Sequence, residues 1–242
     1  MHSKARWVQA DCVYRYSRDH GADTHEVDGL PNFKHSFRPR DPSLKQLQLE
    51  RGIYAPAETR HEDQTRRAVI LLRSSPWKAG SEVTPWRDRF DSTSGEARYF
   101  GDNKFGSGDR PEERRGNRLL LDVAPLFTSS SRGTRSLAPP LAVFIGEAGT
   151  IDGRSSPKGF VRFAGIALLE SHEVVRQHDN SGRAFDNLAF DLRMCPLDES
   201  AGRIDWNWID DRRNPAIPAS VANLRAPFAW RYWVETGELP VS

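Results

Sequence analysis

The apolar residues of this chain fall into short runs that turn-forming segments separate. The runs are RRAVILLRSS (66–75), NRLLLDVAPLF (117–127), PPLAVFIGEA (139–148), GFVRFAGIALLESHEVV (159–175) and AFDNLAFDLRMCPL (184–197). The turn segments are GSGDRPEERRGN, SSSRGT, GTIDGRSSPKG and HDNSGR. Short apolar runs bounded by Gly, Pro, Asn and Asp are typical of strands. We therefore predict an α+β, mainly β fold, in which a curved sheet or barrel carries a few flanking helices.

Two segments outside these runs favour helices. SLKQLQLERG (43–52) has a Ser start, spaced leucines and a terminal Gly, and WRYWVETGELP (230–240) has the character of a helix followed by a stop. The first 45 residues are polar, with a loop-like HGADTHEVDGLPNF and a basic arm, FKHSFRPRDP. We predict three parts: an N-terminal extension (1–45), a main domain (46–200) and a Trp-rich C-terminal extension (201–242).

Length and composition bound the class of protein. At 242 residues the chain can bury one sizeable core. No run approaches the roughly 18 apolar residues of a membrane span, and the first residues lack the apolar region of a signal peptide. Cys12 and Cys195 lie far apart, with no clustered histidines beside them. We expect a cytoplasmic protein with two reduced thiols, no zinc site and no membrane association.

Motifs for catalysis are absent from the sequence. It contains no GxSxG, HExxH, GxxxxGK[ST] or GxGxxG, and the seven histidines are scattered. Asp210 and Asp211 precede Arg212 and Arg213, a pattern that favours a solvated ion-pair surface. We therefore expect a binding protein without catalytic residues, cofactor or metal.

Arginine dominates the basic residues. Of 35 Lys and Arg residues, six are lysine and 29 are arginine. The planar guanidinium suits phosphates and base edges, so nucleic acid is a candidate partner. A GC-rich genome that favours arginine codons explains the same bias equally well.

The segment TPWRDRFDSTSGEARYFGDNK (84–104) carries the most specific chemistry. Trp86 and Tyr99 flank Asp88 and Asp91, and a glycine-bearing turn follows. Such a segment forms either an ordinary hairpin or a pocket for a flat ligand with hydrogen-bonding edges.

The order of motifs around this segment resembles the SRA (SET- and RING-associated) domain, which reads modified cytosine in DNA. GIYAP (52–56) resembles the thumb-like loop of that family, AVILL the strand after it, and Tyr99-Phe100-Gly101 its Tyr-x-Gly turn. GNRLLLDVA, PPLAVFIG, VRFAGIALLESHEVV and FDNLAFDLRM follow in the family's order. YFGDNK and the Trp-rich end are most similar to the N-terminal recognition domains of modification-dependent restriction endonucleases, of the AspBHI kind or the His-Asn-His kind.

The resemblance implies a PUA/SRA-like curved β-barrel that binds double-stranded DNA containing 5-methylcytosine or a related modified cytosine. It implies that the base is flipped out of the duplex, within a bacterial restriction system, and that a nuclease domain can follow in the full-length protein. Extruding a base costs a few kcal/mol, and stacking on aromatic rings returns roughly 1–3 kcal/mol per base.

The resemblance also assigns roles within the segment. Trp86 and Tyr99 are candidate walls of the base pocket, and Trp77 competes with Trp86. Asp91 or Asp88 is the candidate acceptor for the cytosine amine, with Asp102 a third. Backbone amides of Phe100, Gly101 and Asp102 are candidate donors to O2 and N3, with the glycine allowing close approach.

Ten further residues are candidate contacts to the DNA backbone or groove: Tyr54, Arg60, His61, Arg73, Arg87, Arg89, Arg98, Lys104, Arg38 and Arg40. The arginines between the aromatics can equally form the solvent face of a hairpin. We expect Arg66 and Arg67 to be solvated. Two other functions stay open: a complete nuclease with an unrecognised active site, and a reader of phosphorothioate DNA or RNA.

Overall fold

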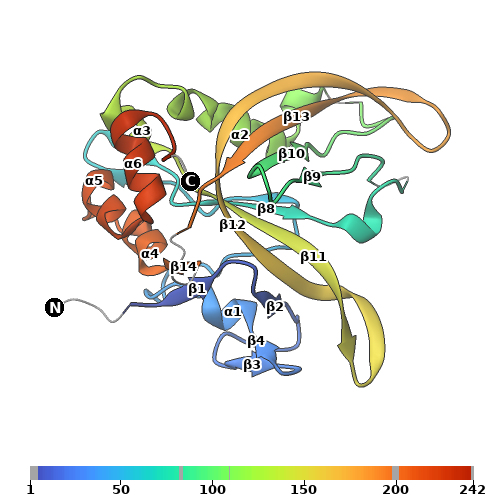
Figure 1. The fold of residues 1–242 in the computed structure, drawn as a ribbon, viewed down its shortest axis with the longest axis horizontal. Helices are drawn as coiled ribbons and strands as arrows, with labels where there is room; N and C mark the ends of the chain where they lie inside the picture. Colours follow the sequence, from blue (N-terminus) through green and yellow to red (C-terminus); the bar gives the residue numbers. More distant parts are fainter. Residues whose placement is uncertain (1–4, 82–83, 109, 198–201, 241–242) are drawn as a thin grey trace.

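A strongly curved sheet forms the centre of the molecule (Figure 1). This computed structural model describes residues 5–81, 84–108, 110–197 and 202–240. The sheet follows the order β5-β8-β11-β12-β13-β10-β9, and β2 pairs with β12 outside that path. Only β8 and β11 run parallel; the other neighbours are antiparallel. The bounds are β2 (Val13–Arg15), β5 (Ile53–Tyr54), β8 (Ile70–Ser74), β9 (Arg89–Phe90), β10 (Glu96–Phe100), β11 (Leu141–Ile151), β12 (Arg154–His178) and β13 (Ala184–Met194).

Three short strand pairs and a set of helices surround this sheet. The pairs are β1 (Trp7–Gln9) with β14 (Arg203–Asp205), β3 (Glu26–Val27) with β4 (Leu30–Pro31), and β6 (Thr59–His61) with β7 (Gln64–Arg66). The α-helices are α1 (Phe33–Ser36), α2 (Arg115–Phe127), α3 (Arg132–Leu137), α4 (Asn207–Arg213), α5 (Ala219–Ala222) and α6 (Phe228–Thr236). In the described part of the chain the 3-10 helices are η1 (Pro76–Lys78), η2 (Pro111–Glu113) and η3 (Asn223–Arg225). In Figure 1, α3 to α6 gather at one side, and the β11–β12 and β12–β13 hairpins project at the other.

The mainly β fold with a few helices is confirmed. Four of the five predicted apolar runs contain β8, β11, β12 and β13, and α6 ends at Gly237 in the left-handed conformation, as the stop signal predicted. Strands β5 and β9 lie at the two ends of the pairing path, so within the described residues the sheet is open, and a barrel is not confirmed.

Two predictions of secondary structure were wrong. The run 117–127 lies in helix α2, not in a strand, because its buried side chains Leu120, Val123, Ala124 and Phe127 recur at helical spacing. The run 43–52 contains no helix. Its Leu47 and Leu49 are both fully buried, which is the two-residue alternation of an extended segment.

Both terminal segments pack against the central sheet. Strand β1 pairs with β14, β2 pairs with β12, and Phe33 and Phe37 are completely buried in the main core. The predicted boundary at residue 200 lies outside the described residues.

The interpretation of the C-terminal charges as a solvated surface was wrong. Arg212 is fully buried and donates to the carbonyl groups of residues 67, 68, 136, 137 and 138 and to Asn223. Arg66, also expected to be solvated, is buried and donates to four carbonyls between residues 211 and 217. Carbonyl groups at the ends of α3 and α4 lack donors within their helices, and a buried arginine supplies several donors at once. These residues therefore join the C-terminal helices to the sheet.

No helix among the described residues is long and apolar enough to cross a membrane.

Candidate modified-base pocket

A cavity of about 490 Å³ opens beside β10, where the β9–β10 hairpin faces the end of β8 and the loop after it. Its volume is in the range of small-ligand sites, roughly 300–1,000 Å³. Five of the eight predicted pocket residues line it. They are Trp86, Asp88, Tyr99, Phe100 and Asp102. The segment 84–104 therefore folds as a hairpin and forms one side of a pocket.

Asp88 is the carboxylate that the fold places inside this cavity. Its Oδ1 accepts a hydrogen bond of 2.9 Å from the backbone N–H of Phe100, across the hairpin. Burial raises the pKa of Asp88 to about 6, against the opposing effect of hydrogen bonds from Phe100 and Ser74. The carboxylate is ionised at neutral pH, and hydrogen bonds from the protein use only part of its capacity to accept.

Tyr99 lies deeper in the same cavity. It is 4% exposed, and its hydroxyl donates to the backbone oxygen of Arg73 at 3.4 Å. Burial, together with the negative charges of Asp88 and Asp102, raises the pKa of Tyr99 well above its ordinary value. The phenol is therefore neutral, and its ring forms part of the cavity's inner surface.

The turn after Tyr99 does not have free amides, contrary to our prediction. Phe100 N–H donates to Asp88, Gly101 N–H donates to the Leu188 carbonyl at 2.8 Å, and Asp102 N–H donates to Asn117 Oδ1 at 3.2 Å. All three donors are already used within the protein, so none is available to O2 or N3 of a base.

Gly101 is required by a protein contact and does not line the cavity. A Cβ at this position would lie 2.3 Å from Asn117 Oδ1. Asn187 Nδ2 also donates to the Gly101 carbonyl at 2.9 Å. Two asparagines, one from α2 and one from β13, thus hold the turn from both sides, which fixes the end of β10 where Tyr99 is attached.

Trp86 and Trp77 lie in different places. Trp86 lines the cavity of Asp88, whereas Trp77, in η1, lines a neighbouring cavity of about 560 Å³. Asp91 lies in the exposed β9–β10 turn, where its Oδ1 accepts from the amides of Thr93 and Ser94. These hydrogen bonds lower the pKa of Asp91. Of the three aspartates predicted as readers of the base, Asp88 and Asp102 line the cavity and Asp91 does not; Asp102 forms an ion pair with Arg114.

Basic side chains also line the cavity. Arg73, Arg87 and Lys104, all predicted DNA contacts, line it. Arg73 is directed inward, donating to the Leu49 carbonyl at 2.5 Å, and burial lowers its pKa. Arg87 is exposed and its guanidinium lies against Gly80.

The remaining predicted DNA contacts lie outside this cavity. Arg98 forms ion pairs with Glu173 and Asp191, Arg40 with Asp211 at 3.3 Å, and Arg38 with Asp23 at 3.8 Å. Arg60 Nε donates to the Glu62 carbonyl, and His61 Nδ1 lies 2.8 Å from the Pro215 carbonyl. Arg89 is exposed on β9, opposite Arg98, and Tyr54 lies on β5 beside the cavity residue Ile53. The charge of Arg98 is neutralised by two carboxylates, which disfavours a phosphate contact there.

Several cavity residues were missed by sequence reasoning. They are Glu50, Ile53, Ser75, Lys78, Phe90 and Arg114. Arg114 lies 4.0 Å from Asp102 in an ion pair across the mouth. The thumb-like motif GIYAP was a usable signal for Ile53, whereas nothing in the turn GSGDRPEERRGN distinguished Arg114 from its neighbours.

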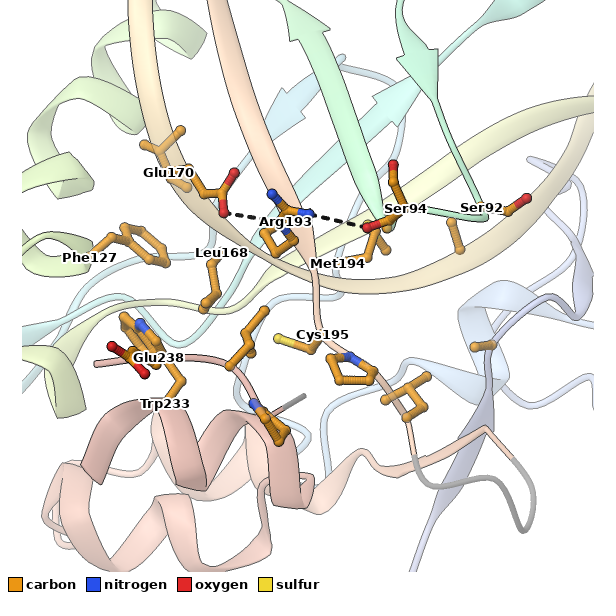
Figure 2. Close-up of a pocket in the computed structure, with 18 of the residues that line it drawn as sticks. Ser92, Ser94, Phe127, Leu168, Glu170, Arg193, Met194, Cys195, Trp233 and Glu238 are labelled. Carbon is orange, nitrogen blue, oxygen red and sulfur yellow. Dashed lines mark hydrogen bonds and ion pairs between the residues drawn. The ribbon is translucent and has the colours of Figure 1, made fainter. Parts of the chain in front are cut away.

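A larger cavity, of about 980 Å³, lies on another part of the molecule (Figure 2). Leu168, Trp233 and Phe127 line one side of it, and Arg193 donates to Glu170 at 3.0 Å and to the Ser94 carbonyl. Burial raises the pKa of Cys195, so its thiol is protonated. The carboxylates that line this cavity, on Asp11, Glu170 and Glu238, are all exposed, so none is held inside it. The smaller cavity of Asp88 is therefore the better candidate for recognising a base.

The described residues contain no group of three His, Cys, Asp or Glu side chains that could hold a metal ion.

Comparison with known proteins identifies the family. A family model described as the N-terminal region of the restriction endonuclease AspBHI matches residues 37–241. The chain belongs to this family. No curated protein matches it. The predicted resemblance to the SRA-like recognition domains of modification-dependent restriction endonucleases is thus confirmed.

Three solved structures are similar over nearly the whole chain. The restriction endonuclease MspJI, in complex with a 27-mer oligonucleotide, is 40% identical with a TM-score of 0.87, over 99% of this chain and 56% of that one. The DNA recognition domain of the cytosine modification-dependent endonuclease LpnPI is 18% identical, with a TM-score of 0.62, over 100% and 99% of the two chains. The modification-dependent endonuclease AspBHI is 23% identical, with a TM-score of 0.60, over 96% and 91%. The last two show the shared fold. This chain spans about half the length of the MspJI chain.

Proposed function

We propose that this chain binds double-stranded DNA containing 5-methylcytosine, or a related modified cytosine, by flipping that base into the cavity of Asp88. The observation that carries the proposal is an ionised carboxylate held inside a base-sized cavity that aromatic side chains, among them Trp86 and Tyr99, also line. The family supports it, since LpnPI is described as a cytosine modification-dependent endonuclease and MspJI was solved with an oligonucleotide.

Asp88 acts as the reader of the cytosine edge in this proposal. Cytosine presents an amino donor at N4, where thymine presents a carbonyl oxygen. An ionised carboxylate accepts from the amine and repels the carbonyl, so it distinguishes a modified cytosine from thymine, which carries a methyl group at the same ring position. The Phe100 amide orients the carboxylate through Oδ1, which leaves acceptor capacity for the base.

Trp86 and Tyr99 supply the stacking surfaces. Stacking on aromatic rings returns about 1–3 kcal/mol per base, which offsets the few kcal/mol needed to extrude it. Ile53 and Phe90, which also line the cavity, offer apolar contacts to the methyl group. Because the amides of the Phe100–Asp102 turn are used elsewhere, the side chains of Arg73, Ser75 and Thr84 are the candidate donors to O2 and N3.

We further propose that the chain recognises DNA without cutting it and that its open curved sheet is a variant of the PUA/SRA-like barrel. In a modification-dependent restriction system, cleavage would then come from a nuclease domain in the full-length protein. Incubating the protein with methylated plasmid and Mg²⁺ or Mn²⁺ tests this part: intact plasmid is expected, and cuts at methylated sites would contradict it.

The binding proposal is tested with one duplex sequence in two forms. Affinity is measured by fluorescence anisotropy at moderate salt for the duplex with a single 5-methylcytosine and for its unmodified counterpart. We expect tighter binding to the methylated duplex. Equal affinities for the two would contradict the proposal, and tighter binding to RNA or phosphorothioate DNA of the same sequence would favour another reader function.

A further inference from the structure

A second cavity adjoins the modified-base pocket and differs from it in character. It has a volume of about 560 Å³ and shares Glu50, Arg73 and Lys78 with the base pocket. Trp77 lines it from η1, and Lys158 lines it from near the start of β12, toward the tip of the projecting β11–β12 hairpin (Figure 1). We call this cavity the Trp77 shelf. The shared residues place the two cavities side by side.

Two ammonium groups are held together on the Trp77 shelf. Lys78 Nζ lies 4.7 Å and Lys158 Nζ 5.1 Å from the centroid of the Trp77 ring. The two nitrogens are therefore no more than about 10 Å apart. A cation over an indole ring is stabilised by the ring's quadrupole, which offsets part of the repulsion between the two like charges.

The position of Trp77 is fixed by the backbone around it. The 3-10 helix η1 is closed by hydrogen bonds from Lys78 N–H to Ser75 and from Ala79 N–H to Pro76, at 2.9 and 3.1 Å. The indole lies over Gly146 of β11, where an added Cβ would come within 3.5 Å of Trp77 Nε1. Trp77 remains 38% exposed. The indole ring of Trp77 therefore has a fixed position, and it keeps the ammonium groups of both lysines near the surface.

Neither lysine has a carboxylate partner within ion-pair distance among the described residues. This contrasts with Arg98, Arg162 and Arg193 on the sheet, each of which pairs with two carboxylates. Two acidic residues do line the shelf, Asp19 and Glu50. The Glu50 carboxylate hydrogen-bonds the Tyr16 hydroxyl, and Arg18 and Arg73 add positive charge on the same wall.

We propose that the Trp77 shelf binds the phosphates that flank the flipped nucleotide on the same DNA strand. This inference rests on the proposed function and assigns Lys78 and Lys158 to the DNA backbone, with Trp77 positioning them instead of stacking on a base. Phosphate contacts fix the register of a protein on DNA but carry no sequence information. The shelf therefore contributes equally to binding of modified and unmodified duplexes.

The salt dependence of binding tests this inference. Each phosphate contact contributes about −0.9 to the slope of log affinity against log salt. Lys78→Gln and Lys158→Gln are each expected to make that slope less negative by about 1, and to weaken binding to methylated and unmodified duplexes by the same factor. Trp77→Leu is expected to weaken both by an equal factor as well, because the two lysine heads lose their common support.

Arg132→Gln is the matched control. It removes one positive charge from an exposed arginine of α3, which lies beside α6 and lines neither cavity. It is expected to leave the slope unchanged, and thermal melting of all variants checks that each is folded.

The outcomes separate this inference from the proposed function. Unchanged slopes in both lysine variants would overturn the phosphate assignment while leaving any methyl preference intact. A methyl preference that disappears in Lys158→Gln would also overturn it, because the shelf would then contact the base. Equal binding of methylated and unmodified DNA by the unsubstituted protein would instead refute the proposed function, and absence of DNA binding would refute both.

Discussion

If Asp88 reads the cytosine amine as proposed, its titration gives the binding of methylated DNA a defined pH dependence. The pKa of Asp88 is raised by burial to about 6 in the free protein. At pH 7.5 roughly 97% of the carboxyl is ionised and at pH 5.0 roughly 9%, from the tenfold change per pH unit. If only the ionised form accepts from the cytosine amine, affinity for methylated DNA falls about tenfold across this range. About three-quarters of the loss is expected below pH 6.5.

The assay is a series of anisotropy titrations from pH 8.0 to 5.0 at constant ionic strength. Asp88→Asn removes the titrating group, so its affinity is expected to be low throughout and flat with pH. Asp91→Asn is the control, because Asn can still accept from the turn amides and Asp91 lies outside the cavity. An affinity that does not change with pH in the unsubstituted protein would refute the assignment of Asp88. So would an affinity that is independent of pH in Asp91→Asn but depends on pH in Asp88→Asn.

Three further outcomes follow from the same contacts. Tyr99→Ala removes one stacking surface, so affinity for the methylated duplex should fall by about 1–3 kcal/mol, or about 5- to 150-fold, with little change for the unmodified one; an equal loss for both would mean that Tyr99 only supports the fold. Asp88→Asn should also stabilise the free protein by up to about 3 kcal/mol at pH 7.5, since ionising Asp88 there costs the folded state, in which its pKa is about 6, more than the unfolded state, in which it is 3.8. That cost falls to about 0.6 kcal/mol at pH 4; chemical denaturation at the two pH values measures the difference, and no gain at pH 7.5 would contradict it. Arg212→Met should lower the free energy of unfolding by at least about 3 kcal/mol, because five carbonyl groups lose a buried donor; a change under 1 kcal/mol would contradict the role given to Arg212.

The sequence predicted the strands whose apolar runs are short and bounded by turns. It did not predict helix α2, because the three consecutive leucines at 119–121 look like a short apolar strand. The helical spacing of Leu120, Val123 and Phe127 was therefore not recognised. It also missed the burial of Arg66 and Arg212, since a run of charges looks the same whether it meets water or backbone carbonyls. Tertiary packing decides whether a charged side chain is exposed or buried, and a local sequence pattern does not indicate that packing.

The candidate pocket was predictable to the extent that it is local. Asp88 and Tyr99 come from one hairpin, so a single segment of sequence contained both. The choice between Trp77 and Trp86 depended on β11 and the loop after β8, which lie far apart in sequence. The role of Gly101 depended on Asn117 and Asn187, which no spacing within the segment could indicate.

A crystal structure of the protein with a duplex that carries one 5-methylcytosine tests the central claim most directly. The account predicts that the modified cytosine lies outside the helical stack, in the cavity of Trp86 and Tyr99, with its N4 about 2.7–3.2 Å from an Asp88 carboxylate oxygen. A modified cytosine that stays stacked in the duplex, or that occupies a different cavity, would contradict it.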